Sequence, residues 1–551
     1  MLNFDSLTLK AFVNENEQFL NGASLKKIQQ PSRRELILQL RNYGENKKLY
    51  ININPEFFHI CFVEDFNKRG ISIPNEAPMF CMLLRKYIYN AKISNVIVPM
   101  GERILEFHFE YKDVLQESQR LCLTFELMGK YSNIILYNFD TKIILGCAHN
   151  VGEEKSKYRE LAGTLPYIYP QQQLKTDITN EQEQNFIHKY ADILDTTSFA
   201  YEISSDYFYF TNPLVKQFLN FLQINELDNN ALLKFLNFSK NIFSFKNLQP
   251  SLSNDFDEFS PVLLDNFKKC DSFNSMINDY FEYHQIQKLL KQKKEKLYFI
   301  LNSKIKKLKN QIGIFKTKLL DIEKADIYKN KADILMTNIY AQVKPIINLI
   351  NPYNDENIQI ELDTNLNIVQ NANRYYKLYK KTKTAIEYSK TKIEELNSIL
   401  AKYEEQVFYI EIASNLEEIN EVMFELDIKN DTEIKKQVKK EYLLENFDIE
   451  GFKVFVGKNS LQNDYLLSKI AAPEDLWFHP LNMPGAHLIL KKNNKQVPDN
   501  VLLQCAKLTK KFSKTSKDIK IPIIYTERKY VKKANSKIAF VTYRNEKEIY
   551  C

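Results

Sequence analysis

The sequence is poor in glycine and proline, with 12 and 17 residues among 551. It contains neither GxxxxGK(S/T) nor GxGxxG, the motifs whose glycine-rich loops cradle phosphates. This scarcity argues against an enzyme that binds a nucleotide through such a loop, and against a collagen-like or disordered chain. No run of 18 apolar residues is present, so we expect no membrane span and no membrane partner.

Cysteines are few and scattered. None of the seven forms a CxxC pair, and their number is odd, so neither a disulfide framework nor a zinc knuckle is expected. They are Cys61, Cys81, Cys122, Cys147, Cys270, Cys505 and Cys551. Acidic residues stand near the N-terminus, where a signal peptide would be basic and then apolar. We therefore expect reduced thiols, a cytoplasmic location, and no metal or other cofactor.

Histidines are equally scarce, with seven in the chain. His479 and His487 stand on either side of a Pro-Gly turn, in the stretch DLWFHPLNMPGAHLIL that also holds Trp477, the only tryptophan. Asp475 or Glu474 could add a third metal ligand, but this spacing is a weak metal signal. No nucleophile and base come together elsewhere in the sequence. We expect histidines that pack or hydrogen-bond around a turn, and no enzyme.

The positive charge is concentrated at one end of the chain. The net charge is +7, but residues 451–551 hold 19 Lys and Arg against 8 Asp and Glu, while the other 450 residues carry −4. A basic terminal module on a near-neutral body points to a polyanionic partner. A lysine surface that only keeps the protein soluble is the alternative.

Hydrophobic periodicity predicts an α+β protein of several domains. Residues 1–172 combine helices near 5–20 and 78–92 with alternating strands such as RELILQLR and LYININ, and form a mixed α/β domain with an antiparallel sheet. The prolines of GTLPYIYP, residues 163–170, predict an extended linker at the end of this domain. Residues 173–288 are predicted to form a second, mostly helical domain.

Residues 289–428 predict a long coiled coil. Apolar side chains repeat with 4-3 spacing from Leu301 to Ile322 and again, with one position missing, from Ile386 to Ile410. Asn-Pro and Asn-Asp signals between the two runs mark turns. Because one chain supplies both helices, we expect an antiparallel hairpin; a dimerising rod is the alternative.

Residues 442–551, after a charged stretch at 429–441, predict a small α/β module that contacts RNA. Lysines along VLLQCAKLTKKF form one stripe on a helix, and other basic residues surround Tyr530. Lysine ammoniums suit phosphates, while Trp, Tyr and His rings can stack on unpaired bases. Trp477 could instead anchor the core of the module. The candidate RNA-binding residues are Trp477, His479, His487, Lys507, Lys510, Lys511, Lys514, Lys532 and Lys533.

Several blocks of sequence resemble the NFACT family of ribosome-associated quality-control factors. In the C-terminal module they are GFKVFVGKNSLQNDYL, DLWFHPLNMPGAHLIL and YVKKA. Upstream they are SLKKIQQPSRRELILQLR, MFCMLLRKYI, FELMGKYSNIILYN and LDTNLNIVQNANRYYKLYKK. The likeness covers essentially the whole chain in the expected order. It implies an N-terminal domain related in fold to certain DNA glycosylases, a helix-hairpin-helix-like domain, a coiled-coil middle domain and an RNA-binding module.

The resemblance implies a role in stalled translation. Family members bind large ribosomal subunits obstructed by peptidyl-tRNA, contact ribosomal RNA, and recruit tRNA, carrying alanine in bacteria, for template-free C-terminal tailing of the nascent chain. The ribosome forms the peptide bonds, so we expect a tRNA-recruiting factor, monomeric on the ribosome and without catalytic residues. A cytoplasmic RNA- or ribosome-binding factor without tailing is one alternative. A fibronectin-binding adhesin, a role ascribed to relatives, is another.

Two sites carry over from the family residue by residue. An Asp-Arg pair of the first domain corresponds to Glu102-Arg103 in MGERILEF, where Glu102 is longer than aspartate by one methylene. Further tRNA-recruiting residues correspond to Glu126 and Leu127 in FELMGKYSN. The resemblance therefore implies tRNA binding by these four residues. A surface ion pair at a hairpin turn, contributing about 0–1 kcal/mol, is the alternative for the first pair.

Overall fold

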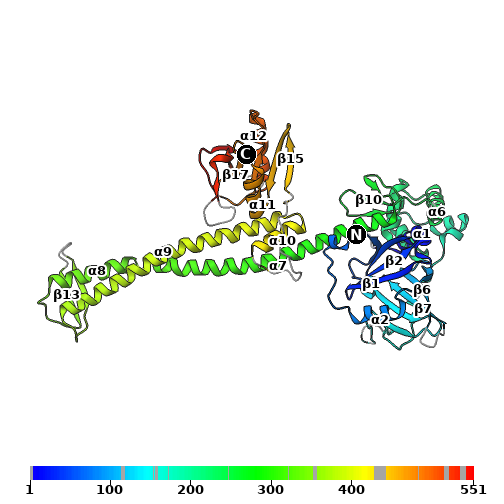
Figure 1. Cartoon of the computed structure of the whole chain (residues 1–551), viewed down its shortest axis with the longest axis horizontal. Coiled ribbons are helices and arrows are strands. Elements are labelled where there is room, and N and C mark those ends of the chain that lie inside the picture. The colour runs from blue at the N-terminus through cyan, green and yellow to red at the C-terminus, as the bar shows by residue number, and fades with distance from the viewer. Residues whose placement is uncertain are drawn as a thin grey trace. The chain divides into compact units, whose positions relative to one another are not determined.

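The computed structural model describes residues 4–551 apart from 113–117, 153, 155–158, 172, 246, 321, 351–355, 427, 429–441, 443, 482, 514–519 and 534–540. The charged stretch at 429–441 thus lies outside the described residues. The chain divides into two units, Met1–Lys288 and Leu289–Cys551 (Figure 1). Among the described residues, no helix is long and apolar enough to cross a membrane.

The first unit opens with a helix followed by a four-stranded sheet. The carboxylate of Asp5 caps the helix by accepting a hydrogen bond from the backbone N–H of Thr8 at 2.8 Å. Leu36, Leu38 and Leu40 are buried, as their alternation predicts. The elements are α1 (Ser6–Leu20), β1 (Ser24–Ser32), β2 (Glu35–Asn42), β3 (Glu45–Asn52) and β4 (His59–Val63), and the strands pair antiparallel in that order.

A second antiparallel sheet follows, and it carries the first predicted site. Its strands pair in chain order, and the helix α2 (Met79–Ile88), which the sequence predicts, contacts both sheets. The strands are β5 (Ile93–Ile97), β6 (Ile104–Lys112), β7 (Ser118–Glu126), β8 (Asn133–Asn138) and β9 (Ile144–Cys147). The two sheets and α1 share one hydrophobic core, so the mixed α/β character predicted for this part of the chain is confirmed.

The rest of the first unit is mainly helical, as predicted, and has its own core of phenylalanine and tyrosine rings. Its helices are α3 (Glu183–Tyr190), α4 (Thr196–Asp206), α5 (Asn212–Phe221) and α6 (Asn229–Phe243). A small sheet in the order β11-β10-β12 follows, formed by β10 (Ser251–Ser253), β11 (Phe259–Ser260) and β12 (Phe267–Lys269). These strands are too short to leave a period-two pattern, so the sequence does not predict them.

The second unit contains the predicted helical hairpin (Figure 1). The helix α7 (Phe273–Leu319) starts in the first unit, α8 (Ile322–Thr337) follows it, and α9 (Ile368–Ile412) returns. The rings of Phe315 and Tyr388 lie 6.1 Å apart, and Lys309 forms a 2.9 Å ion pair with Glu404, so the helices run antiparallel. The predicted antiparallel hairpin is confirmed. Between α8 and α9 the chain forms the strands β13 (Ile346–Ile350) and β14 (Asn357–Glu361), where the sequence indicates only turns.

The C-terminal module is a six-stranded antiparallel sheet with a helix against one face. The strand order is β15-β16-β18-β17-β19-β22. The strands are β15 (Glu445–Ile449), β16 (Phe452–Gly457), β17 (Leu476–Pro480), β18 (His487–Leu490), β19 (Pro522–Glu527) and β22 (Lys547–Tyr550). The helices of the module are α11 (Ser460–Tyr465) and α12 (Asp499–Lys511), whereas the preceding α10 (Leu416–Glu425) shares a hydrophobic cluster with α7 and α9. Two hydrophobic clusters, one for each face of the sheet, form its core.

Candidate nucleic-acid interface

The Glu102–Arg103 pair lies in the turn that joins β5 to β6. The backbone N–H of Glu102 donates to the carbonyl oxygen of Pro99 at 3.1 Å, which closes the turn. β6 begins directly afterwards, at Ile104. Both side chains of the pair are half-buried, so they keep a surface that a ligand can reach.

Gly101 is required by the shape of this turn. Its φ of +69° lies in the left-handed region, which favours glycine. A Cβ atom at this position would stand 2.2 Å from Cδ1 of Phe208, closer than any real contact. The turn therefore packs its backbone at Gly101 against the ring of Phe208, in the helical part of the first unit.

The guanidinium of Arg103 can bind an anion. Its guanidinium lies over the ring of Phe58, with the carbon 5.3 Å from the centroid, and within the described residues it has no hydrogen-bond or ion-pair partner. Burial lowers the pKa of Arg103, and the charges of Asp5 and Glu102 oppose this shift. Burial raises the pKa of Glu102, opposed by Arg103 and Lys175. The N–H groups of Arg103 remain available to an anion such as a phosphate.

The second predicted pair lies beside the first. β6 and β7 are in register with Ile104 opposite Glu126, and the backbone N–H of Leu127 donates to the carbonyl oxygen of Arg103 at 2.9 Å. The two stretches that the resemblance singles out are thus neighbours on adjoining strands. The sequence alone could not place them together, because strand register depends on the whole sheet.

The side chains of this second pair are not exposed. Glu126 and Leu127 are both fully buried. The carboxylate of Glu126 accepts a bidentate pair of hydrogen bonds from Arg159, one of them Nη1–Oε1 at 2.7 Å, and a third from the hydroxyl of Tyr167 at 2.9 Å. In this arrangement the carboxylate of Glu126 binds Arg159 and Tyr167, and its burial prevents a direct contact with tRNA.

The segment at residues 163–170 begins with a turn at Gly163–Thr164 and has no regular secondary structure after Pro166, and it is held against the sheet. The backbone N–H of Tyr167 donates to the carbonyl oxygen of Lys142 at 2.6 Å, and its ring is buried and stacks on Tyr137 at 4.4 Å. The hydroxyl of Tyr169 donates to the carboxylate of Glu106. Prolines prevent a regular strand here, but the tyrosines of PYIYP bind the segment to the sheet. Arg159 and Tyr167 carry no motif, so the sequence reading missed them.

In the C-terminal module, α12 presents the predicted lysine stripe. Its apolar side packs on the sheet, while Lys507 and Lys511 are exposed and Lys510 is half-exposed. Lys514 lies outside the described residues. The exposed lysines are on the side of the helix away from the core, where they can reach a phosphate backbone.

The basic residues around Tyr530 divide into two kinds. Lys532 and Lys533 are exposed, and Lys533 forms an ion pair with Asp464. Arg528 instead binds backbone, with Nε donating to the carbonyl oxygen of Leu467 at 3.0 Å. Only part of this basic cluster is therefore free for a ligand.

Trp477 lies in the core, the alternative that the sequence left open. Its ring has no exposed surface and packs in one of the two clusters of the module. His479 stacks on it at 5.5 Å with the planes 5° apart, and His487 meets it edge-on at 5.4 Å. A ring without exposed surface cannot stack on a base, so direct RNA contact by Trp477 does not fit this structure.

The two histidines pack around the turn, as the sequence analysis expects, although it also includes them among the candidate RNA-binding residues. Burial lowers the pKa of His479 to about 4 and lowers the pKa of His487 as well. Both rings are therefore neutral at physiological pH and offer no charge to a phosphate. The turn between them needs Gly485, because a Cβ there would stand 2.4 Å from Cγ of Pro480.

Comparison with known families covers residues 5–542 of the chain. Residues 5–442 match the NFACT N-terminal and middle domains, and residues 442–542 match the NFACT protein RNA binding domain. Both candidate surfaces fall inside matched regions. The junction of the two matches, at residue 442, is also where the predicted C-terminal module begins.

Relatives that align over most of the chain agree with this assignment. The chain is 28% identical over 562 residues to the Rqc2 homolog RqcH of Streptococcus suis, covering 100% of this chain and 98% of the relative. It is 26% identical over 575 residues to the Rqc2 homolog RqcH of Bacillus subtilis, covering 100% and 98%. The archaeal Rqc2 homolog aRqcH of Methanocaldococcus jannaschii is 25% identical over 587 residues, covering 92% and 80%.

Proposed function

The chain belongs to the NFACT family, and from that membership we propose that it is a cytoplasmic, ribosome-associated quality-control factor. It binds large ribosomal subunits obstructed by peptidyl-tRNA and recruits tRNA for template-free C-terminal tailing of the stalled nascent chain. Alanyl-tRNA is the proposed cargo. The ribosome makes the peptide bonds, so this protein contributes binding and positioning. Relatives named RqcH that align over the full chain support the proposal.

The guanidinium of Arg103 is the observation that supports tRNA recruitment most strongly. It is half-buried against Phe58, has no anionic partner in hydrogen-bond contact among the described residues, and lies at an ordered turn. A preorganised arginine with free N–H groups suits a phosphate oxygen pair. Glu126 contributes indirectly, because its ion pair with Arg159 supports the strand beside Arg103.

The C-terminal module supports contact with ribosomal RNA. Its exposed cations are Lys507 and Lys511 on α12 and Lys532 further along the chain, and they can supply phosphate contacts that do not depend on base sequence. The neutral histidines pack against Trp477, which lies in the hydrophobic cluster on one face of the sheet. We therefore propose that the lysines bind RNA and that the buried rings maintain the fold of the module.

Sequencing of co-purified RNA tests the proposal. The tagged protein is purified from its own cells as wild type, Arg103→Ala, Arg103→Lys, and Arg33→Ala as a control at an exposed arginine on another turn. We expect large-subunit RNA in every sample, and one tRNA family enriched in wild type and Arg33→Ala but lost in Arg103→Ala. Recovery of this tRNA enrichment in Arg103→Lys would show that a positive charge at position 103 is sufficient for tRNA binding. A tRNA profile unchanged by Arg103→Ala would contradict the proposal.

A ribosome-binding factor without tailing is the second candidate, and Glu102 favours it. The family carries aspartate at this position, and the longer side chain moves the carboxylate relative to Arg103. Glu102→Asp distinguishes the two candidates. If this chain supports tailing, the variant should enrich tRNA within about twofold of wild type. A large gain in tRNA on Glu102→Asp would favour the second candidate.

A further inference from the structure

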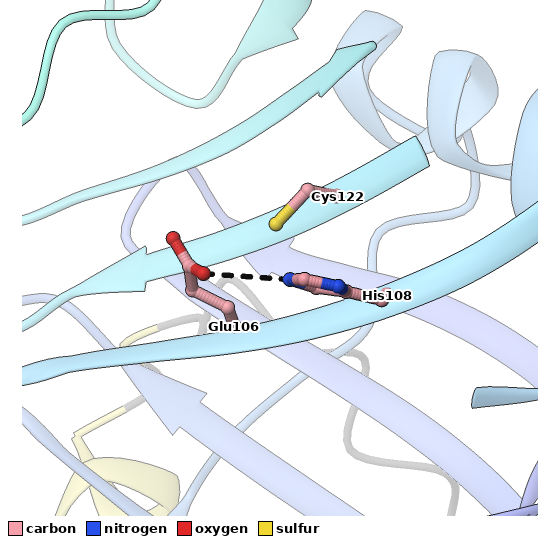
Figure 2. A group of neighbouring side chains, drawn as sticks. All are labelled: Glu106, His108 and Cys122. Carbon is pink, nitrogen blue, oxygen red and sulfur yellow. Dashed lines mark hydrogen bonds and ion pairs between the residues drawn. The ribbon is translucent and has the colours of Figure 1, made fainter. Parts of the chain in front are cut away.

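Three side chains with metal-binding atoms converge on the second sheet, away from Arg103. Glu106 and His108 lie on β6, and Cys122 lies directly opposite His108 on β7. Figure 2 shows the carboxylate, the imidazole and the thiol pointing toward one another. Their ligand atoms all lie within 4.8 Å of one another, and Oε2 of Glu106 is 3.4 Å from Nε2 of His108. Glu106 and Cys122 are buried, and His108 is partly open.

Among the described residues, Glu106 has no arginine or lysine in an ion pair with it, whereas the neighbouring carboxylate of Glu126 does. Two buried carboxylates occupy this face of the sheet, and Glu126 has the guanidinium of Arg159. Among the described residues, the ion-pair partner of Glu106 is only the imidazole of His108, which is charged only when protonated. The nearby ammonium of Lys142 lies instead over the ring of Phe139, at 4.2 Å. A buried carboxylate is costly without a cation, so this site favours a positive ligand.

We propose that Glu106, His108 and Cys122 form a binding site for a zinc ion. One carboxylate oxygen, one imidazole nitrogen and one thiolate sulfur are the three ligand types that Zn²⁺ takes in proteins. Mg²⁺ and Ca²⁺ prefer oxygen ligands alone, so the sulfur argues against them. Two light-atom ligands about 2.0–2.1 Å from a tetrahedral ion lie roughly 3.4 Å apart, which is the separation seen between Glu106 and His108.

The surrounding residues fit such an ion. The sulfur of Cys122 lies 3.4 Å from the hydroxyl oxygen of Thr124, and Tyr169 donates a hydrogen bond to the other carboxylate oxygen of Glu106. These contacts orient two of the three ligands before an ion arrives, as groups around metal ligands commonly do. The ion would join β6 to β7 and, through Glu106, fix the segment that carries Tyr169. Three protein ligands leave one position of a tetrahedral ion for solvent.

Zinc binding at this site must release a proton. Zinc binds the thiolate form of cysteine, so an ion at this site displaces the proton of the Cys122 thiol. Affinity should therefore rise with pH, by about tenfold per unit while one proton is released for each ion. An ion held by surface carboxylates alone would not show this dependence above pH 6.

Metal analysis of the full chain tests the site. The protein is loaded with Zn²⁺ in excess, dialysed, and assayed for bound zinc and for its thermal shift. The test variants are Cys122→Ser and His108→Gln. The matched control is Cys147→Ser, which removes another thiol from the same sheet. His487→Gln controls for zinc held by the histidine pair of the other unit.

We expect about one zinc per chain in wild type and both controls, and at least a tenfold loss of affinity in the two test variants. Loading wild type with Co²⁺ gives a second readout, a near-ultraviolet charge-transfer band of a thiolate–cobalt bond, which does not depend on a variant folding. Absence of stoichiometric zinc and of this band, or equal zinc in wild type and Cys122→Ser, would overturn the proposal.

Discussion

The backbone N–H of Leu127 donates to the carbonyl oxygen of Arg103 at 2.9 Å, immediately beyond the paired residues Ile104 and Glu126. This bond makes one structural element of two stretches that are far apart in the sequence. A change at Glu126 should therefore reach Arg103 through the strands, without a shared ligand contact. Experiments can therefore distinguish whether Glu126 contacts tRNA directly or acts on tRNA binding through Arg103.

Removing one partner of the buried ion pair should destabilise the first unit. Arg159→Met leaves the carboxylate of Glu126 buried without its cation, and such losses cost about 3–5 kcal/mol. The double variant Glu126→Leu/Arg159→Met should recover much of this cost, because no charge is left unpaired. Hydrogen exchange at β6 and β7 measures the effect. Loss of tRNA in Glu126→Gln with unchanged exchange would instead indicate direct contact.

Gly101→Ala should disturb the turn that carries Arg103. The new Cβ would meet Phe208 at 2.2 Å, and the positive φ would be strained as well. We expect a loss of about 1–3 kcal/mol in the free energy of unfolding, together with weaker tRNA binding. Gly152→Ala is the matched control, because nothing lies within 4 Å of a Cβ at that position and its φ is not positive. Equal denaturant midpoints for the two variants would contradict the assigned role of Gly101.

The C-terminal module should lose stability in mild acid. The folded-state pKa of His479 is about 4, and that of His487 is also lowered, whereas an unfolded histidine titrates near 6.5. The unfolded chain therefore binds more protons between pH 6.5 and about 4. The free energy of unfolding should fall there by up to about 1.4 kcal/mol per pH unit for each histidine.

Trp477 reports this transition, because it is the only tryptophan and its ring contacts both histidines. Urea unfolding followed by its fluorescence should give midpoints that fall below pH 6.5, more steeply in wild type than in His479→Gln/His487→Gln. Parallel pH profiles for the two proteins would show that the histidines do not carry the effect.

Removal of exposed lysines from α12 should weaken RNA binding without changing its selectivity. Lys507→Ala and Lys511→Ala each remove one phosphate contact, so the slope of log K against log salt should fall by about 0.7–1 for each. Lys453→Ala, at an exposed lysine on β16, is the control. Filter binding to ribosomal RNA across salt concentrations measures these slopes. If the slopes for Lys507→Ala and Lys511→Ala equal the wild-type slope, the α12 surface does not contact RNA phosphates.

Local periodicity predicted much of the fold, and residues paired across strands account for most of what it missed. The 4-3 spacing predicted two antiparallel helices, and Phe315 does meet Tyr388. The sequence could not show that Tyr167 and Arg159 converge on Glu126, because that requires the register of the sheet. The proposed zinc ligands His108 and Cys122 are likewise neighbours only through strand pairing and form no spaced motif.

The burial of Trp477 shows a different limit of sequence reading. Its neighbours in DLWFHPLNMPGAHLIL alternate too little to say which side faces the core. The structure places β17 between β18 and β19 and packs a hydrophobic cluster on each face of the sheet, so Trp477 is buried on one face and Phe478 on the other. A strand that is covered on both faces gives no period-two signal. The sequence therefore could not show whether Trp477 belongs to a binding surface or to the core.

Tail synthesis is the most direct test of the proposed function. Purified large subunits carrying a peptidyl-tRNA are combined with this protein and one charged tRNA at a time, without messenger RNA or small subunits, and the released peptide is weighed by mass spectrometry. We predict successive additions of alanine with alanyl-tRNA and wild-type protein, and none with Arg103→Ala. A peptide of unchanged mass, from subunits that still bind the protein, would contradict the tailing role.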